Sequence, residues 1–369
     1  MKSTTMRTVA AVAGLAVVAA ACGSDDDGGA ASAETECEVG EVDGDLRLYN
    51  WAEYIDPEHL EAFAGEFGIS ATMDTYESNE VMQSVIAAGN SGYDVIVPSD
   101  YMVGIMIDGE FLRPLDFSVI PNIENLSDDF ANPSYDPEQA FSVPYQWGYT
   151  GLSVDTEVVG TDFPRSWDLV FGDAASEFSG QITLLDDPRE TLGAALKAAG
   201  NSLNSTDQGE LDAARDLVSA TKDNLLAFDT DTSDELITAG ESAIAHTYSG
   251  DAFTQFLDTD DPSRYIFFVP EEGGTRWVDN MAIPFDAENV CTAHTFINWV
   301  LDADEGATLS NWNYYGTPNA AALDALDAEL NEFLTSPDVL VGGPDSVESI
   351  LDTGEFEINY SDAFTEAKG

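Results

Sequence analysis

Apolar residues recur with two different spacings over the first folded segment of the chain, residues 45–97. A spacing of two or an unbroken apolar run predicts a strand, and a spacing of three to four predicts a helix. The segment predicts three strands and two helices in alternation, with strands at 45–51, 69–76 and 93–97 and helices at 57–67 and 79–88. Asp56 and Pro57 are a typical start for the first helix, and Gly68 ends it. Because strands joined through helices by short connections lie parallel, this segment predicts an α/β fold with a parallel sheet between helices.

The second half of the chain shows the same alternation, without an internal sequence repeat. Further strands are predicted at 181–185, 242–245, 265–269 and 276–283, and a helix is predicted from Glu190. Ligands of such sheets bind beyond the carboxyl ends of the strands. The residues at these ends combine aromatic rings and carboxylates with almost no basic residue: Trp51, Glu53, Tyr54, Ser99, Tyr101, Asp187, Glu190, Trp277 and Asp279.

Rings and carboxylates together suit a buried cation. A cation removed from water needs paired negative charge, and a methylene chain between ammonium groups needs flat apolar walls. Each aromatic face adds about 0.5 to 2 kcal/mol per well-placed cation. Taken singly, a tryptophan at a strand end also fits simple packing, and an aspartate fits an ordinary surface position. The combination predicts a slot for a ligand that carries several ammonium groups.

The amino terminus has the features of an export signal. Lys2 and Arg7 precede a short apolar run, after which small residues lead to Cys22. This arrangement resembles the lipobox of bacterial lipoproteins, so we expect a signal peptide over 1–21 and lipidation of Cys22. An uncleaved anchor helix is the alternative, although the run is short for a membrane span. Gly, Ala, Ser and Asp dominate the residues that follow, which predicts a flexible tether over 22–43.

The net charge excludes two kinds of partner. The 369 residues include 12 basic and 70 acidic residues, which gives a formal net charge of −58. Such a surface repels nucleic acid and anionic membranes, so we expect no nucleic-acid partner and no membrane contact beyond the lipid anchor. Acidity of this size also indicates a salty habitat, in which ions screen the repulsion between like charges. The ligand prediction therefore rests on the strand-end residues and not on the net charge.

Two cysteines, Cys37 and Cys291, remain after Cys22 is assigned to the lipid. In an oxidising compartment we expect a disulfide between them rather than two free thiols. The chain has no CxxC motif and no group of cysteines and histidines, so we expect no metal and no cofactor.

Two other functions compete with cation binding. Asp187 and Glu190 could be the acid and base of a secreted lipoprotein hydrolase, but their spacing at one helix start places them side by side rather than on opposite faces of a bond. The adjacent Tyr314 and Tyr315 suggest the iron ligands of a ferric-ion-binding protein, but no His and Glu stand in matching places. The three histidines lie in separate segments and suit structural roles: His59, His246 and His294.

Seven segments, in order along nearly all of the mature chain, resemble the spermidine/putrescine-binding proteins of ABC importers. They are 48–55 (LYNWAEYI), 75–80 (TYESNE), 93–101 (YDVIVPSDY), 143–148 (VPYQWG), 186–190 (DDPRE), 277–284 (WVDNMAIP) and 317–319 (TPN). The resemblance implies a type II periplasmic-binding-protein-like fold, in which two α/β lobes close over the ligand about a hinge. It implies lobe 1 at 44–151 and 280–331 and lobe 2 at 152–279 and 332–369.

The resemblance also implies the side chains that hold the ligand. The aromatic rings that line the family's site correspond to Trp51, Tyr54, Tyr101, Tyr248, Trp277 and Tyr315. Its carboxylates correspond to Glu53, Asp187, Glu190 and Asp279, and its hydroxyl groups to Ser99 and Thr230. Asp279 and Glu190 are the expected main ammonium partners, and Asp187 shares one end of the ligand. Three residues depart from the family pattern: Ala52 replaces a threonine, Tyr248 a tryptophan and Glu357 a glutamine. Because Glu357 adds a carboxylate, we expect spermidine or a longer polyamine rather than putrescine.

Finally, the resemblance implies a transport function without catalysis. We expect an extracytoplasmic monomer, held at the outer face of the cell membrane by lipidated Cys22. It would capture a polyamine and present it to the permease subunits of an ABC importer.

Overall fold

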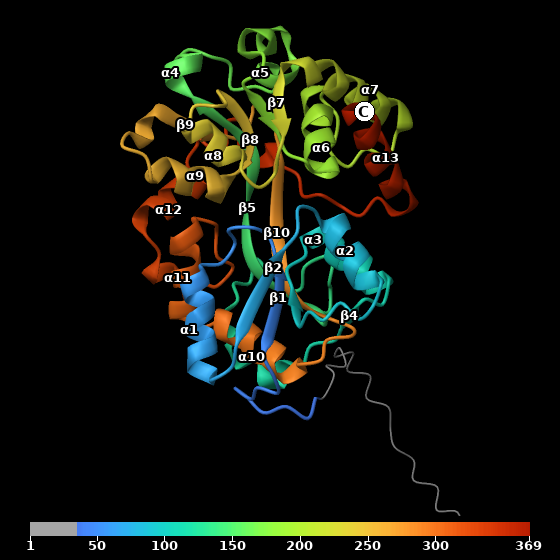
Figure 1. Ribbon diagram of the computed structural model, residues 1–369, viewed down its shortest axis with the longest axis vertical. Helices are drawn as coiled ribbons and strands as arrows, with labels where there is room; N and C mark the ends of the chain where they lie inside the picture. Colours follow the sequence, from blue (N-terminus) through green and yellow to red (C-terminus); the bar gives the residue numbers. More distant parts are fainter. Residues whose placement is uncertain (1–34) are drawn as a thin grey trace, which may run out of the picture. The chain divides into compact units, whose positions relative to one another are not determined.

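A mixed β-sheet runs through residues 35–369, the part of the chain that this computed structural model describes (Figure 1). The strands are β1 (Leu46–Asn50), β2 (Ala71–Thr75), β3 (Val95–Ile96), β4 (Leu112–Arg113), β5 (Ser142–Asp155), β6 (Ile182–Leu184), β7 (Leu225–Phe228), β8 (Ile244–Tyr248), β9 (Tyr265–Phe268) and β10 (Thr275–Pro284). Their order is β2-β1-β3-β10-β5-β8-β6-β7, with β4 paired to β10 and β9 to β5. The predicted signal peptide, Cys22 and the first part of the predicted tether lie outside the described residues.

The amino-terminal elements form as their local signals predict. β1 pairs parallel with both β2 and β3. α1 (Pro57–Phe67) follows Asp56, whose carboxylate accepts a hydrogen bond from the Glu58 N–H at 2.8 Å, and it ends at Gly68 with a φ of 70°. α2 (Asn79–Ala87) joins β2 to β3. The prediction of three strands and two helices in this segment is confirmed.

Two long central strands, β5 and β10, make the sheet mixed rather than parallel. They pair antiparallel with each other, and β10 is also antiparallel to β3. The prediction of a parallel sheet therefore holds for β1 to β3 and for β6 with β7 and β8, and it is wrong for the centre. Large apolar residues alternate with polar or small ones along β5, at Val143, Tyr145, Trp147 and Tyr149, but nearly every residue of the strand is buried, so the alternation does not show which strands pair with it.

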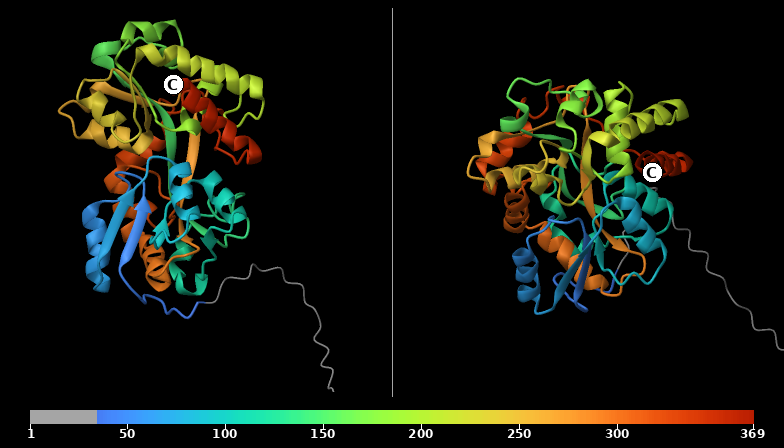
Figure 2. Two further views of the ribbon diagram at one scale, coloured as in Figure 1. Left: turned by 45° about the vertical axis from the view of Figure 1, so that its right-hand side comes forward. Right: turned by 45° about the horizontal axis from the view of Figure 1, so that its top comes forward.

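The two lobes of the fold share β5 and β10, which run from one lobe into the other (Figure 1). In the first lobe, helices α1, α2, α3 (Asp100–Asp108), α10 (Val290–Val300) and α11 (Ala303–Asn313) surround β1 to β3. The second lobe contains β6 to β9 with α4 (Thr156–Val159), α5 (Asp168–Phe171), α6 (Pro188–Ala198), α7 (Gln208–Thr221), α8 (Ser233–Thr238), α9 (Ser249–Leu257) and α13 (Glu357–Lys368), as two further views show (Figure 2). α12 (Ala328–Thr335) follows α11. Leu48, Phe63 and Phe296 belong to the first core, and Ile182 and Phe268 to the second.

α6 begins two residues earlier than predicted, at Pro188 rather than Glu190. The reason is the side chain of Asp187, which caps the helix: its Oδ1 accepts hydrogen bonds from the Arg189 N–H at 2.8 Å and the Glu190 N–H at 2.9 Å. The cap fixes Asp187 and Glu190 relative to each other at the end of β6.

Residues 35–43 are attached to the first lobe. Cys37 and Cys291 form a disulfide with a Cα–Cα distance of 5.4 Å, and the Thr35 N–H donates to Asp116 at 2.8 Å. The carboxylate of Asp43 accepts from the Thr292 N–H at 3.0 Å, near the start of α10. The predicted flexible tether is therefore shorter at its carboxyl-terminal end. Within residues 35–369, no helix has both the length and the apolar character needed to cross a membrane.

Candidate ligand-binding site

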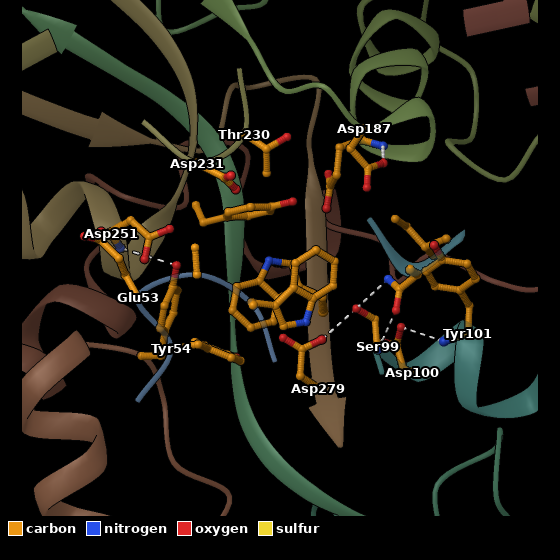
Figure 3. Close-up of a pocket in the computed structure, with 18 residues that line it drawn as sticks. Glu53, Tyr54, Ser99, Asp100, Tyr101, Asp187, Thr230, Asp231, Asp251 and Asp279 are labelled. Atoms are coloured by element: carbon orange, nitrogen blue, oxygen red, sulfur yellow. Dashed lines mark hydrogen bonds between the residues drawn. The ribbon is translucent and has the colours of Figure 1, made fainter. Parts of the chain in front are cut away.

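A cavity lies between the lobes, beyond the ends of β1, β3, β6 and β7 and beside β10 (Figure 3). The space between the lining side chains measures about 710 Å³ when the open solvent at its mouth is included. Twelve of the thirteen predicted ligand-binding residues line it: Trp51, Glu53, Tyr54, Ser99, Tyr101, Asp187, Glu190, Thr230, Tyr248, Trp277, Asp279 and Tyr315. The structure thus brings together side chains that are spread over more than 260 positions of the sequence.

Trp277 is at the centre of an aromatic wall. Its ring meets those of Tyr315, Tyr248 and Tyr54 edge to face, with centroids 5.1, 6.0 and 6.3 Å away. Gly148 on the neighbouring strand β5 leaves room for the indole, because a Cβ at this position would lie 2.7 Å from a Trp277 ring carbon. The absence of a side chain at residue 148 is therefore part of how the site is built.

Trp51 and Tyr101 enter the cavity from the first lobe and are held by their polar atoms. Trp51 Nε1 donates to the Val97 carbonyl at 3.0 Å. The Tyr101 hydroxyl donates to Glu80 at 2.9 Å, and the guanidinium of Arg189 lies 5.4 Å from the centroid of the Tyr101 ring. Both rings are thus fixed before any ligand arrives.

Asp279 is a buried carboxylate with a hydroxyl partner. Its Oδ1 accepts a hydrogen bond from Ser99 Oγ at 2.6 Å, and Ser99 is itself held by Asn79, whose Nδ2 donates to Ser99 Oγ at 3.0 Å (Figure 3). Burial raises the pKa of Asp279 to about 7. Without a ligand this carboxyl group therefore titrates near neutral pH.

Glu190 and Asp187 occupy the cavity at the start of α6. Glu190 accepts hydrogen bonds from Thr150 Oγ1 at 3.0 Å and Thr275 Oγ1 at 2.7 Å, and burial raises its pKa to about 7. Burial, and then the charges of Glu80 and Glu190, raise the pKa of Asp187 well above its ordinary value. Ionised forms of both groups lack a cationic partner in the cavity.

Glu53 belongs to a second group of carboxylates at the other end of the cavity, with Asp231 and Asp251 (Figure 3). Burial raises the pKa of Glu53, and the charges of Glu235 and Asp231 raise it further. Burial and neighbouring negative charges also raise the pKa of Asp251 well above its ordinary value. These shifts mean that the carboxylates at this end repel one another.

Thr230 and Tyr248 close the cavity from the second lobe. Thr230 Oγ1 accepts a hydrogen bond from the Asp186 N–H at 3.0 Å, which leaves the hydroxyl proton free to be donated elsewhere. The Tyr54 hydroxyl, on the opposite wall, has no hydrogen-bond partner among the described residues.

Sequence reasoning did not predict every residue that lines the cavity. The additional ones are Asn79, Asp100, Asp231, Asp251 and Ile350, together with Ala52, which was noted only as a departure from the family. Asp231 and Asp251 follow β7 and β8, so the rule that strand ends carry the site could have found them. Ile350 carries no such signal, because a long loop brings it to the cavity.

Glu357 does not line the cavity, so its predicted role as a ligand carboxylate is not supported by its position. Its two carboxylate oxygens accept hydrogen bonds from Arg189 Nη1 at 2.9 and 2.7 Å. Arg189 is only 1% exposed, and a buried guanidinium needs a negative partner. In this structure Glu357 therefore neutralises an arginine of the protein.

Tyr314 and the three histidines lie in structural positions outside the cavity. Tyr314 packs against Phe253 outside the cavity, so the two adjacent tyrosines do not converge. His59 pairs with Glu305 at 2.8 Å, burial lowers the pKa of His246 to about 3, and His294 Nε2 accepts the Asp116 N–H at 3.0 Å. Within residues 35–369, no group of three or more His, Cys, Asp or Glu side chains is arranged to hold a metal ion.

A cleft of this kind between two α/β lobes that share crossing strands defines a solute-binding protein of the type II periplasmic-binding-protein fold. The family model described as bacterial extracellular solute-binding protein matches residues 58–336, and the chain belongs to this family.

Comparison with known proteins gives close relatives in both sequence and structure. The chain is 35% identical to the spermidine/putrescine-binding periplasmic protein of Escherichia coli K12 over 79% of its own length and 83% of that protein. The spermidine/putrescine ABC transporter substrate-binding protein of Streptococcus pneumoniae superposes with a TM-score of 0.69 at 33% identity, covering 88% of this chain and 99% of that one. A lipoprotein of Treponema pallidum superposes with a TM-score of 0.73 at 28% identity, with the same coverage.

Proposed function

We propose that this protein captures a polyamine outside the cytoplasm and delivers it to the permease of an ABC importer. The observation that carries the proposal is the composition of the cavity wall. Among the described residues that line it are seven carboxylates, six aromatic side chains and no Lys, Arg or His; the carboxylates are Glu53, Asp100, Asp187, Glu190, Asp231, Asp251 and Asp279. A neutral or anionic solute would leave this charge unbalanced.

The raised pKa values support a cationic ligand. In the free protein, burial favours the protonated forms, with pKa values of about 7 for Asp279 and Glu190 and about 8 for Asp100. An ammonium group that enters the cavity stabilises the ionised carboxylates and releases their protons. The rings of Trp51 and Trp277 offer apolar faces for the methylene groups between the amines.

The names of the relatives agree with this ligand class, since the E. coli and S. pneumoniae proteins are described as binding spermidine and putrescine. The residues that line the cavity would bind the polyamine without any covalent step. Ser99 and Thr230 supply hydroxyls, and the carboxylates of both lobes meet the ammonium groups as the lobes close about β5 and β10. We propose that the two lobes that close in this way are those predicted from the sequence, at 44–151 with 280–331 and at 152–279 with 332–369.

We further propose that the protein acts as a monomer tethered by a lipid at Cys22, on the outer face of the cell membrane. The basic start, the short apolar run and the small residues before Cys22 support a lipoprotein signal. The T. pallidum relative is likewise described as a lipoprotein. Mass spectrometry of protein from a membrane fraction tests the anchor, because lipidated Cys22 would be the first residue.

A thermal-shift and calorimetry panel tests the ligand class. Putrescine, spermidine and spermine are compared with n-butylamine, which has the same alkyl chain as putrescine but one ammonium group. A ligand at about 100 times its Kd stabilises the folded state by about 2.7 kcal/mol, so we expect a clear rise of the melting temperature with the polyamines and little with butylamine. Equal responses to butylamine and putrescine would contradict a site built for several ammonium groups.

Two further arms separate this function from the alternatives. Ferric ion tests an iron-binding function, which the position of Tyr314 outside the cavity does not favour. Recovery of the polyamine unchanged after prolonged incubation tests for catalysis by Asp187 and Glu190. Turnover of the amine, or stabilisation by iron alone, would overturn the proposal.

A further inference from the structure

Two buried side-chain amides pair with each other beside the aromatic wall of the cleft. Gln146 Nε2 donates to Asn313 Oδ1 at 2.8 Å, and Asn313 Nδ2 donates to Gln146 Oε1 at 2.7 Å. Both side chains are buried, and neither residue lines the cavity. Gln146 lies in the central strand β5, opposite Asp279 of β10, and Asn313 is the last residue of α11. The two reciprocal hydrogen bonds fix both the position and the plane of each amide.

Asn313 uses the same amide to hold two residues of the cavity wall. Its Nδ2 donates to the Tyr54 carbonyl at 3.5 Å, and its Oδ1 accepts from the Tyr315 N–H at 3.3 Å. The Tyr54 carbonyl also accepts from the hydroxyl of Tyr145, the neighbour of Gln146 in β5, at 2.8 Å. The rings of Tyr54 and Tyr315 meet edge to face, with centroids 5.1 Å apart. Asn313 thus joins the two chain segments whose rings form this part of the wall.

The position of Tyr315 also affects the contact between the lobes. Its hydroxyl accepts a hydrogen bond at 3.3 Å from the N–H of Asp251, in the first turn of α9 (Figure 3). Its ring lies against Gly250 of the same helix, where a Cβ would come within 2.6 Å of two ring carbons. Because α9 belongs to the second lobe and Tyr315 follows α11 of the first, a shift of Tyr315 would change the cavity wall and the interlobe contact together.

Stability alone does not require a polar pair at this place. Burial removes the amide of Gln146 from water, and its hydrogen bonds return only a small net free energy. A methionine has a similar length and would be buried without that cost. What the amide pair adds is direction, since each hydrogen bond requires its partner at one distance and angle.

We propose, on the basis of the proposed function, that Gln146 and Asn313 are positioning residues of the ligand site. Their amide pair holds Tyr54 and Tyr315 in place before the polyamine arrives, and this preorganisation contributes to the affinity. A side chain that becomes immobilised only on binding weakens the complex, because the loss of its freedom opposes association. Rings that are already fixed in the free protein avoid this loss.

Gln146→Met tests the pair with the least disruptive change. Asn313 keeps its contacts with Tyr54 and Tyr315 but loses the partner that fixes its plane. We expect calorimetry to show spermidine bound about tenfold more weakly. The melting temperature without ligand should stay within about 3 °C of that of the unsubstituted protein.

A second buried pair of β5 supplies the matched control. Ser153 Oγ and Thr247 Oγ1 lie 2.7 Å apart, and neither residue lines the cavity. The double substitution Ser153→Ala and Thr247→Val removes both hydroxyls, so that neither is left without a partner. This variant should bind spermidine within about twofold of the unsubstituted protein.

Fluorine NMR of protein labelled with 3-fluorotyrosine measures the positions of the rings directly. Tyr54→Phe and Tyr315→Phe identify the two signals among those of the 13 tyrosines. In the free protein, both signals should shift or broaden in Gln146→Met, while the tyrosine signals of the second lobe stay in place. A general loss of packing would instead change signals in both lobes.

The proposal is overturned if Gln146→Met binds spermidine as tightly as the unsubstituted protein, if the control weakens binding to the same extent, or if the Tyr54 and Tyr315 signals stay unchanged. Should Gln146→Met not fold, Asn313→Asp removes the other donor of the pair, and the same change of the two signals in the free protein is required. If no amine binds to the unsubstituted protein, the proposed function fails, and the fluorine spectra still decide whether the pair positions the rings.

Discussion

Asp279→Asn removes one charge from the cleft and little else. Asn retains an oxygen that can accept the hydrogen bond from Ser99 Oγ, now 2.6 Å from Asp279 Oδ1. The folded structure should therefore persist, while a ligand ammonium group loses its buried counter-ion. Losing one member of a buried charge pair costs about 2 to 5 kcal/mol, so we expect the affinity for spermidine at pH 8 to fall by about 30-fold or more.

The pH dependence of the same variant makes the prediction sharper. With a pKa of about 7 in the free protein, Asp279 is ionised at pH 8 but mostly protonated at pH 6. A ligand that requires the ionised form must then remove the proton, which costs about 1.4 kcal/mol per pH unit below the pKa. Amines with a pKa near that of lysine stay charged over this range. Spermidine affinity should thus decrease as the pH falls through 7, and Asp279→Asn should lower the slope of log affinity against pH by about one.

Isothermal titration calorimetry of both proteins at pH 6, 7 and 8 measures the two effects together. The melting temperature of each protein without ligand serves as the control for folding. An affinity that is unchanged at pH 8, or a weakened affinity with the same pH slope as the unsubstituted protein, would refute the assignment of Asp279 as an ammonium partner.

Three further predictions concern the stability of the free protein, the aromatic wall around Trp277 and the role of Glu357. The buried carboxyl groups of the cleft have folded-state pKa values above their unfolded values, so they oppose folding increasingly as the pH rises from about 4 to about 7. The rise in melting temperature that spermidine causes should accordingly be larger at pH 8 than at pH 5.5. Gly148→Ala places a methyl group 2.7 Å from the present position of the Trp277 ring and should displace the indole. Calorimetry should then show spermidine binding weakened by about 1 to 3 kcal/mol, and an unchanged circular dichroism spectrum would show that the variant folds. Glu357→Gln leaves the buried Arg189 without its carboxylate and should lower the free energy of unfolding, measured in urea, by up to about 3 kcal/mol. The affinity for spermidine should stay within about threefold of the unsubstituted protein. A loss of affinity without a loss of stability would instead assign Glu357 to the ligand site.

Local signals made the first lobe and the position of the site predictable. Asp56, Pro57 and Gly68 set the limits of α1, because caps act within a few residues. The strand-end rule and the family resemblance together identified most residues of the cavity wall, since parallel strands bring their carboxyl ends to one edge. The same rule applied to β7 and β8 would have added Asp231 and Asp251.

The structure departs from the sequence-based expectations where distant residues act on each other. The alternation along β5 marks a strand, but nothing in it shows that the strand runs antiparallel to β10, because the pairing joins residues far apart in the sequence. Glu357 lies at a position that the family resemblance assigned to the ligand, and only the packing of α13 shows that Arg189 takes its charge. Residues 35–43 have the composition of a tether but are held by a disulfide and by hydrogen bonds to residues far along the chain.

By itself the sequence determined the α/β class and indicated a cationic ligand, because helix caps, strand patterns and an excess of rings and acids at strand ends are local features of the chain. The family followed from the seven segments that resemble its members. The tertiary structure decided which carboxylates stand without a partner. Burial and charge pairing depend on which groups lie near each side chain in space, so Glu357, which pairs with Arg189, and Asp251, which lines the cavity, could be told apart only after the chain was folded.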